Sequence, residues 1–256
     1  MEPIKEALTF DDVLLLPRYS NNLPAETNID LKISNKISLK VPFFSSAMDT
    51  VTESPMAIAI AKVGGMGIIH RNLDIKKQSH EVLKVKKKNL LVGAAIGTSD
   101  KDIIRAKSLI DNGVDILVID TAHGHSKKVL DILAKIKKNK NKISICVGNI
   151  ATSEAAKNIY NAGADILKVG IGPGSICTTR MIAGIGVPQI TALMQVKKIL
   201  KNKKIKIISD GGIKFSGDIV KALAAGADAI MMGSIFAGTD ESPGKKFKIK
   251  NKFYKY

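Results

Sequence analysis

Eight short apolar runs recur along this 256-residue chain at nearly constant spacing, and this repeat constrains the fold more than any other feature. Helical patterns lie between the runs, whose starts are 24, 25, 24, 27, 23, 40 and 23 residues apart. Each run is continuously apolar rather than alternating, which is typical of parallel strands that are buried on both faces. The predicted strands are residues 43–46, 67–70, 92–97, 116–120, 143–148, 166–170, 206–209 and 229–234.

Eight strands that alternate with helices predict one α/β domain, a (β/α)8 TIM barrel. Gly113, Gly163 and Gly226 each stand shortly before a predicted strand, where a left-handed glycine ends the preceding helix. We expect residues 1–40 to form an N-terminal extension that packs on the barrel. After the last strand the chain runs through residues 235–244 to the Lys-rich residues 245–256, so the last helix and the C-terminal segment of a complete barrel are expected to be missing.

The composition excludes several classes of protein. A membrane-spanning protein is not expected, because no run approaches the roughly 18 consecutive apolar residues of a membrane span. The N-terminus lacks the apolar core of a signal peptide. Two cysteines are too few for a disulfide framework. The net charge of +17 raises nucleic-acid binding as an alternative. However, 36 of the 40 basic residues are lysines, clustered mostly at predicted helix ends, and no aromatic residues interleave with them before Phe247. We therefore expect a solvated surface, no nucleic-acid or membrane partner, and a cytoplasmic location.

The 40-residue interval follows the sixth strand and contains an unusually long glycine-rich loop at residues 171–187. Barrel enzymes carry their chemistry on the loops that follow the carboxyl ends of strands. Within this loop Cys177 is a candidate nucleophile, because the nearby charge of Arg180 favours its thiolate. The alternative is an inert thiol. Cys146 lies inside an apolar run and is expected to be core.

Two neighbouring strands, the seventh and the eighth, end in glycine-rich turns. Gly211 and Gly212 follow one strand, and Gly233 and Ser234 follow the other. Backbone amides at this pair of loops bind phosphate in many barrels, although tight turns alone also require glycine. Asp210 stands beside these turns and suits ribose hydroxyls.

Further polar residues end other strands at the same mouth of the barrel. Asp120 is positioned to accept from a second ribose, and Ser46, Met48 and Asn149 face the same opening. His123 and His125 make only a weak metal-ligand pattern, because two histidines one residue apart lack a third ligand nearby. No Rossmann or Walker motif occurs, so a dinucleotide would have to bind across the barrel loops.

Six segments around these residues resemble the inosine-5′-monophosphate (IMP) dehydrogenase family, in the same order and over nearly the whole chain. The longest reads Gly-Pro-Gly-Ser-Ile-Cys-Thr-Thr-Arg at residues 172–180, continues to residue 189, and resembles the catalytic loop of that family. The others are residues 8–15, 45–53, 120–126, 210–218 and 238–244.

The resemblance implies the oxidation of IMP to xanthosine monophosphate with NAD, a step toward guanine nucleotides. Cys177 would attack C2 of the purine to form a covalent thioimidate after hydride transfer, and Thr179 would help to orient the adduct. The implied substrate contacts are Ser46, Met48, Ser175, Asp210, Gly211, Gly212, Gly233 and Ser234. The implied contacts to NAD are Asp120, Thr121, Ala122, Asn149, Gly170, Ile171 and Gly172. The implied potassium ligands are the carbonyls of Gly172, Gly174 and Cys177.

Two departures from the family pattern qualify these expectations. The nucleotide-sensing (CBS) modules that usually lie between barrel strands two and three are absent, because residues 82–92 join those strands directly. The family pattern continues beyond residue 256 with further segments, including the flap that carries the water-activating Arg, so we expect residues 245–256 to be the start of the flap region. Hydrolysis of the adduct is therefore expected to be impaired in this fragment.

The resemblance leaves two alternatives of function. Guanosine monophosphate (GMP) reductase shares the barrel and the cysteine loop, but residues 45–53, 123–126 and 183–189 favour the dehydrogenase. A protein that binds a purine nucleotide without turning it over is the second alternative. The family also implies a homotetramer.

Overall fold

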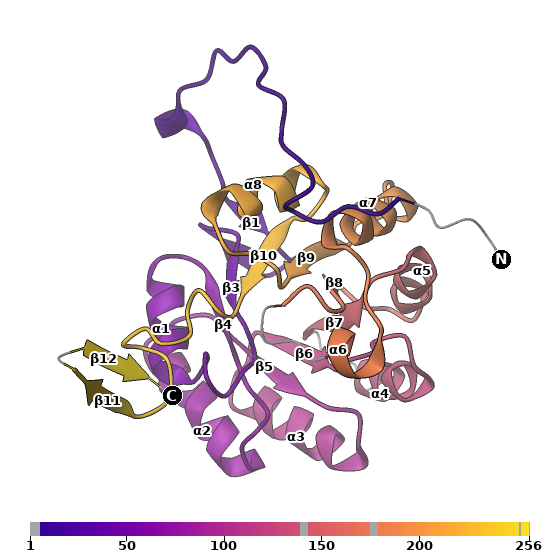
Figure 1. Cartoon of the computed structure of the whole chain (residues 1–256). Coiled ribbons are helices and arrows are strands. Elements are labelled where there is room, and N and C mark those ends of the chain that lie inside the picture. The colour runs from indigo at the N-terminus through magenta and orange to yellow at the C-terminus, as the bar shows by residue number, and fades with distance from the viewer. Residues whose placement is uncertain (1–5, 139–142, 175–178, 251, 256) are drawn as a thin grey trace.

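The computed structural model describes residues 6–138, 143–174, 179–250 and 252–255, and its centre is a closed barrel of eight parallel strands (Figure 1). Strands that follow one another along the chain lie side by side, and the last strand pairs with the first. The predicted (β/α)8 barrel is confirmed, because every predicted strand overlaps an observed one. The barrel strands are β3 (Phe43–Ser45), β4 (Met66–Ile69), β5 (Val92–Ile96), β6 (Ile116–Asp120), β7 (Ser144–Ile150), β8 (Ile166–Val169), β9 (Lys206–Asp210) and β10 (Ala229–Met232).

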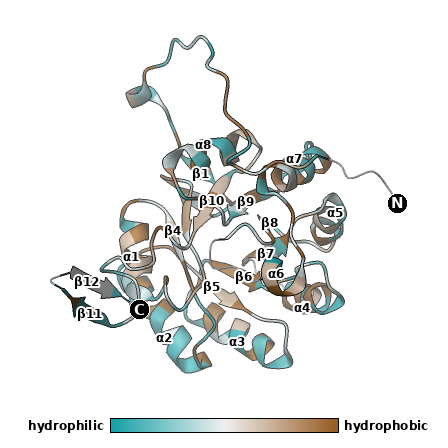
Figure 2. Ribbon diagram, in the orientation of Figure 1, coloured by the Kyte–Doolittle hydropathy of each residue, from teal (hydrophilic) through white to brown (hydrophobic). Residues whose placement is uncertain are grey.

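Helices surround the barrel, and their polar faces point outward while the strands are apolar (Figure 2). The long interval after β8 contains two helices rather than one, which explains its 40 residues. Within the described residues no helix follows β10, and a hairpin of β11 (Lys246–Ile249) and β12 (Lys252–Lys255) stands there instead. The helices are α1 (Ser54–Lys62), α2 (Ile75–Lys86), α3 (Asp100–Asp111), α4 (Lys127–Lys138), α5 (Ser153–Asn161), α6 (Thr179–Ala183), α7 (Gln189–Ile199) and α8 (Ser216–Ala224).

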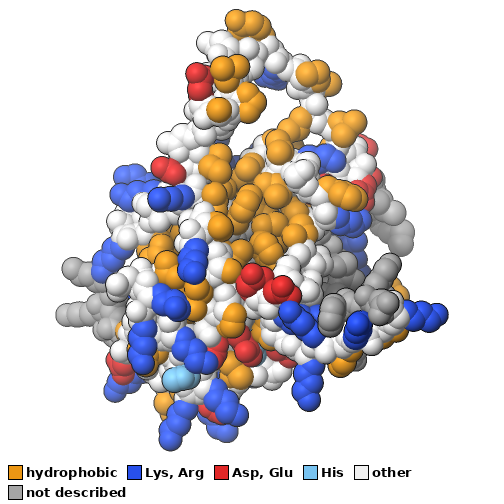
Figure 3. Space-filling view, turned by 90° about the vertical axis from the view of Figure 1, so that its left-hand side faces the viewer, with side chains coloured by type: hydrophobic (Ala, Val, Ile, Leu, Met, Phe, Trp, Pro, Cys, Tyr) orange, Lys and Arg blue, Asp and Glu red, His pale blue; other side chains and the backbone are white. Residues whose placement is uncertain are grey.

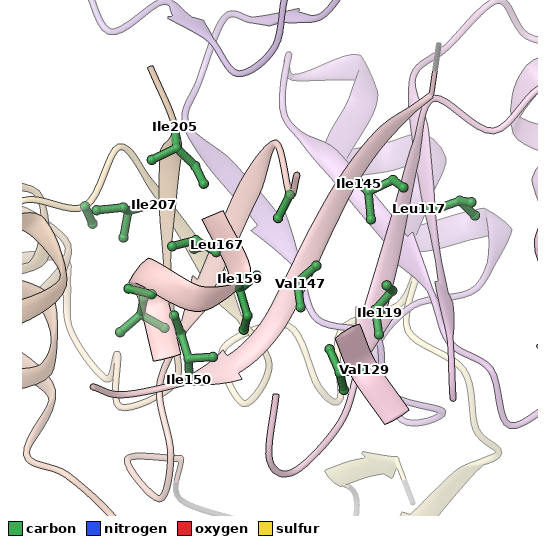
Figure 4. Packing of buried hydrophobic residues seen from close by; sticks show 14 of the residues in the cluster. Leu117, Ile119, Val129, Ile145, Val147, Ile150, Ile159, Leu167, Ile205 and Ile207 are labelled. Carbon is green, nitrogen blue, oxygen red and sulfur yellow. The ribbon is translucent and has the colours of Figure 1, made fainter. Parts of the chain in front are cut away.

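Two apolar layers hold these elements together. The outer layer fills the space between strands and helices, as Figure 4 shows for Leu117, Val147 and Val129. The inner layer fills the barrel itself and includes Phe44 and Ile208. Since alternate residues of a strand point to opposite faces, the two layers divide each strand between them.

The segment before β3 closes one end of the barrel. Its two short strands, β1 (Leu31–Lys32) and β2 (Ser38–Leu39), pair with each other, and Leu39 is buried in the inner apolar layer. The amide of Lys40 donates to the carbonyl of Gly64 at 2.9 Å, and Gly64 stands just before β4. The hairpin therefore lies at the amino ends of the strands and leaves the carboxyl ends open.

Phe10 is buried in the outer apolar layer, and the chain between it and the hairpin projects away from the barrel, at the top of Figure 1, and includes the short 3-10 helix η1 (Pro24–Glu26). Its apolar side chains are exposed: Leu14 is 85% exposed and Tyr19 is 94% exposed. Figure 3 shows hydrophobic side chains along this projection. Nowhere in the described part of the chain is a helix both long and apolar enough to cross a membrane.

Local capping explains where the outer helices begin. The hydroxyl of Thr152 accepts from the amide of Ala155 at 3.2 Å and caps α5. At α8, Ser216 is the first helical residue and Phe215 holds the cap position, where no side chain caps the helix. The carboxylate of Asp218 instead accepts the amides of Lys214 and Phe215, at 2.9 and 3.0 Å.

Replacing Thr152 by alanine is expected to lower the free energy of unfolding by about 1 kcal/mol, because one amide at the start of α5 loses its acceptor. Chemical denaturation measures the change. Thr152→Ser keeps the hydroxyl and should recover most of the loss. Equal stability of the alanine variant and the parent protein would show that the cap contributes nothing.

Candidate functional site

A pocket of about 210 Å³ opens at the carboxyl ends of the barrel strands. Segments that follow five of the strands converge on it, because barrel closure brings those ends together. Asp210 and the glycine turns after β9 and β10 form one side, and the loop after β8 forms the other. The lining residues are Ser46, Met48, Asn149, Gly170, Gly172, Pro173, Gly174, Asp210, Gly211, Gly212, Ile213, Lys214, Met231, Met232, Gly233 and Ser234.

A second, more open pocket lies next to the first and shares Met48 with it. Asp120, at the end of β6, contributes a carboxylate to this pocket. The remaining lining residues are Ala47, Asp49, His70, Arg71 and Asn72. Asp120 and Asp210 thus face two adjacent pockets.

The glycine turns leave backbone atoms accessible in the first pocket. Gly211 and Gly212 have φ angles of +90° and +81°, a conformation that side chains rarely adopt. A Cβ on Gly233 would lie 3.1 Å from Sδ of Met48, another lining residue of the pocket. The backbone conformation therefore favours glycine at 211 and 212, and a side chain at 233 would press on Met48.

A buried lysine joins the two carboxylates, and the sequence analysis did not single it out. Nζ of Lys168 lies 2.8 Å from Oδ1 of Asp120 and 3.0 Å from Oδ2 of Asp210, and it also bonds Oδ1 of Asn149. The Lys168 side chain is 3% exposed. Burial alone would lower the pKa of Lys168, but the charges of Asp120 and Asp210 outweigh it and raise the pKa above its usual value. Lys168 is therefore a charged group at the centre of the site.

One signal in the sequence points to this lysine. Lys168 is the only charged residue in the apolar run 166–170, and it has the same parity as Ile166, which faces the barrel interior. A charge at an inward position of a buried strand requires partners of opposite charge. Strand parity therefore indicates an interior ion pair, although it does not name the partners.

Asn149 completes this network. Its Nδ2 donates to the carbonyl of Gly170 at 2.6 Å and to Oδ2 of Asp210 at 2.9 Å. The amide thereby ties the end of β7 to the ends of β8 and β9. Among the predicted cofactor contacts, Asn149, Gly170 and Gly172 line the first pocket, and Asp120 lines the second.

Other predicted residues lie elsewhere. Three of the predicted NAD contacts that the structure describes line neither pocket: Thr121, Ala122 and Ile171. The Thr121 hydroxyl donates to the carbonyl of Gly148, and Ile171 packs against the outer apolar layer. Thr179 begins α6. Ser175 and Cys177 lie outside the described residues, so the structure places neither of them.

Cys146 belongs to the inner apolar layer, as the sequence predicts. Burial raises the pKa of Cys146 to about 12, and Asp120 and Asp210 add to the rise while Lys168 opposes it. Its thiolate is therefore a negligible fraction at neutral pH.

The histidines near the mouth have local partners. Nε2 of His70 lies 3.2 Å from Oε1 of Glu53, and Nδ1 of His70 accepts the amide of Asn72. Nε2 of His125 lies 2.9 Å from Nδ2 of Asn158. No group of three or more His, Cys, Asp or Glu side chains suited to a metal occurs in the part of the chain that the structure describes.

Comparison with known proteins identifies the family. Residues 7–256 match the IMP dehydrogenase / GMP reductase domain. The chain belongs to this family. The resemblance seen in the sequence is thereby confirmed, and the barrel with its pocket at the carboxyl ends is the structure of an IMP dehydrogenase / GMP reductase domain.

Curated relatives in this family are named inosine-5′-monophosphate dehydrogenase. The protein of Borreliella burgdorferi is 47% identical, over 95% of this chain and 74% of its own length. That of Cryptosporidium parvum is also 47% identical, over 99% of this chain and 73% of its own. That of Aquifex aeolicus is 37% identical, over 98% and 78%. The Aquifex alignment extends over 380 positions, more than this chain contains, so that relative has internal segments with no counterpart here.

Proposed function

We propose that this protein oxidises IMP to xanthosine monophosphate with NAD as hydride acceptor. The observation that carries the proposal is a pair of adjacent pockets that share Met48, each with one carboxylate at a strand end. Such a pair suits two ribose-bearing ligands whose reacting rings meet at the shared wall. The names of the relatives support the same reaction.

The first pocket would hold the substrate. Its glycine turns at Gly211, Gly212 and Gly233 are on adjacent strands, where backbone amides can donate to a phosphate, with the Ser234 hydroxyl beside them. Asp210 would accept from the ribose hydroxyls. Ser46 and Met48 would then contact the purine.

The reaction would be a covalent one at Cys177, which follows the lining residue Gly174 by three positions. The thiolate adds to C2 of the purine, and C2 gives its hydride to the nicotinamide. Water then adds to the resulting thioimidate, the carbon–sulfur bond breaks, and the thiolate returns. IMP, NAD and water become xanthosine monophosphate, NADH and a proton. Ser175 and Thr179, on either side of Cys177, would bind the phosphate and orient the adduct.

NAD would supply only the hydride acceptor, held in the second pocket. Asp120 would accept from its ribose, and Thr121 and Ala122 follow directly on the same loop. Asn149 and the segment 170–172 would approach the carboxamide from the other side.

A potassium ion would hold the loop after β8 through backbone carbonyls of Gly172, Gly174 and Cys177. Oxygen donors of a glycine-rich loop suit a hard cation, and Gly172 has φ of +85°, which turns the chain sharply at this point. Two of the three donors belong to residues that line the first pocket. The cation would act by positioning Cys177 rather than by chemistry.

The proposal includes a homotetramer in the cytoplasm. Exposed Leu14, Leu16 and Tyr19 give the projecting segment an apolar surface, and surfaces of this kind commonly contact another subunit. Light scattering on the purified protein measures its assembly.

The decisive assay incubates the protein with IMP and NAD in a potassium buffer and follows NADH absorbance. We expect NADH to form, with one xanthosine monophosphate for each NADH where hydrolysis is complete and a single burst of NADH where hydrolysis is impaired. Formation of IMP from GMP with NADPH alone would assign GMP reductase instead. Binding of IMP by calorimetry without any NADH would assign a nucleotide-binding protein.

Removing potassium is expected to lower the rate by roughly tenfold to a hundredfold, because a misplaced nucleophile reacts slowly. Dialysis against a buffer with a tetraalkylammonium salt of equal ionic strength removes the ion. Re-addition of potassium should restore the rate. An unchanged rate in the dialysed protein would contradict the cation site.

A further inference from the structure

We propose that Lys168 is a positioning residue that couples the two ribose-binding carboxylates, so that a change at the cofactor carboxylate alters the binding of the substrate. The inference rests on the proposed function, because it assigns Asp210 to the substrate and Asp120 to NAD. It gives a role to a residue that belongs to none of the sequence motifs at the site.

The strand register places Lys168 between the two carboxylates. Asp120 is paired with Gly148, and Gly148 with Lys168, in neighbouring strands. A Cβ at position 148 would lie 2.6 Å from Cβ of Lys168, so glycine leaves the path across the barrel open for the lysine. The ammonium group then reaches Asp120 on one side and Asp210 on the other, at 2.8 and 3.0 Å.

One cation serves two carboxylates that are themselves partly exposed to different pockets. Asp120 is 29% exposed and Asp210 is 18% exposed, whereas Lys168 is 3% exposed. Ligands can therefore reach the carboxylates but not the lysine. Lys168 orients the Asp210 carboxylate for a ribose, and the share of its charge that falls on Asp210 depends on how firmly Asp120 holds the ammonium group.

Other lysine–aspartate pairs of the barrel have a different arrangement. Asp115, Asp165 and Asp228 each stand one residue before a strand, each pairs with one lysine, and each accepts one strand amide. These three pairs lie at the amino ends, away from both pockets. They repeat with the barrel unit and have a structural role, whereas Lys168 has two carboxylate partners, at the opposite end.

The first experiment compares Lys168→Met with the control Lys86→Met, which breaks the Asp115 pair. In Lys168→Met we expect KM to rise for both IMP and NAD by about fivefold or more. In Lys86→Met both KM values should stay at those of the parent protein. Lys168→Arg keeps the charge and should recover part of the loss. Unchanged KM values in a folded Lys168→Met protein would overturn the proposal.

The second experiment keeps Lys168 and so does not depend on the folding of the methionine variant. Asp120→Asn removes one of the two carboxylates that share the ammonium group, so more of its charge falls on Asp210 and makes Asp210 a weaker acceptor. We expect the IMP dissociation constant, measured by calorimetry without NAD, to rise about fivefold or more. An unchanged constant would overturn the coupling. Failure of the parent protein to oxidise IMP would instead overturn the proposed function. The binding measurement would still test the coupling, because it requires no turnover.

Discussion

Cys177→Ala is expected to abolish NADH formation, with a fall in kcat of at least about a thousandfold, because no other nucleophile would attack the purine. Binding of IMP should persist within a few-fold, since the phosphate and ribose contacts come from other residues. NADH absorbance measures the loss, and calorimetry measures the retained binding. Full activity of the variant would refute the covalent mechanism.

The other cysteine provides the control. Cys146→Ala removes a buried thiol whose pKa is raised to about 12, so it should leave kcat within a few-fold of the parent protein. A purine nucleotide that carries a halogen leaving group on the ring should label the parent protein and Cys146→Ala once each. Cys177→Ala should stay unlabelled in mass spectrometry. Labelling of Cys177→Ala would place the reactive thiol elsewhere.

Gly170→Ala is expected to lower the free energy of unfolding by about 3 kcal/mol or more, because backbone has to move to admit the methyl group. A Cβ at this position would lie 2.0 Å from the carbonyl oxygen of Asp210, and φ is +152°. The displacement would also separate Asn149 from the Gly170 carbonyl, at present 2.6 Å from its Nδ2. Chemical denaturation and the KM for IMP should both change.

A matched control separates crowding from backbone conformation. Gly163 has φ of +95°, and a Cβ there would meet nothing within 4 Å. Gly163→Ala should cost only about 1 kcal/mol, the ordinary preference of an L-residue against left-handed backbone. Equal losses in the two variants would mean that contact with Asp210 is not the cause.

Several parts of the fold follow from local sequence. A strand is recognisable when it is a continuous apolar run between glycine turns, and Gly113, Gly163 and Gly226 do adopt the positive φ that ends a helix. The long loop after β8 can also be predicted from the sequence, because the spacing between strands along the chain is a local property. The candidate pocket residues after β9 and β10 can be predicted for the same reason, because they directly follow the predicted ends of these strands.

Other parts required the closed barrel. The burial of Leu39 inside it depends on a contact between the segment before β3 and strands far along the chain. The hairpin of β11 and β12 was not expected, because its Lys-rich sequence has no long apolar run. Thr121 and Ile171 are absent from the pocket linings, and their contacts are instead with the Gly148 carbonyl and with the outer apolar layer.

The sequence by itself determined the eight strands, their helices and the end of the barrel at which a site would form, because these depend on periodicity and turns along the chain. Only the tertiary structure decided that Lys168 meets Asp120 and Asp210, and that two pockets share Met48. Those contacts depend on the register between strands, since Lys168 is 48 residues from Asp120 and 42 residues from Asp210 along the chain. Register is set by closure of the whole barrel, since no single strand fixes its own neighbours.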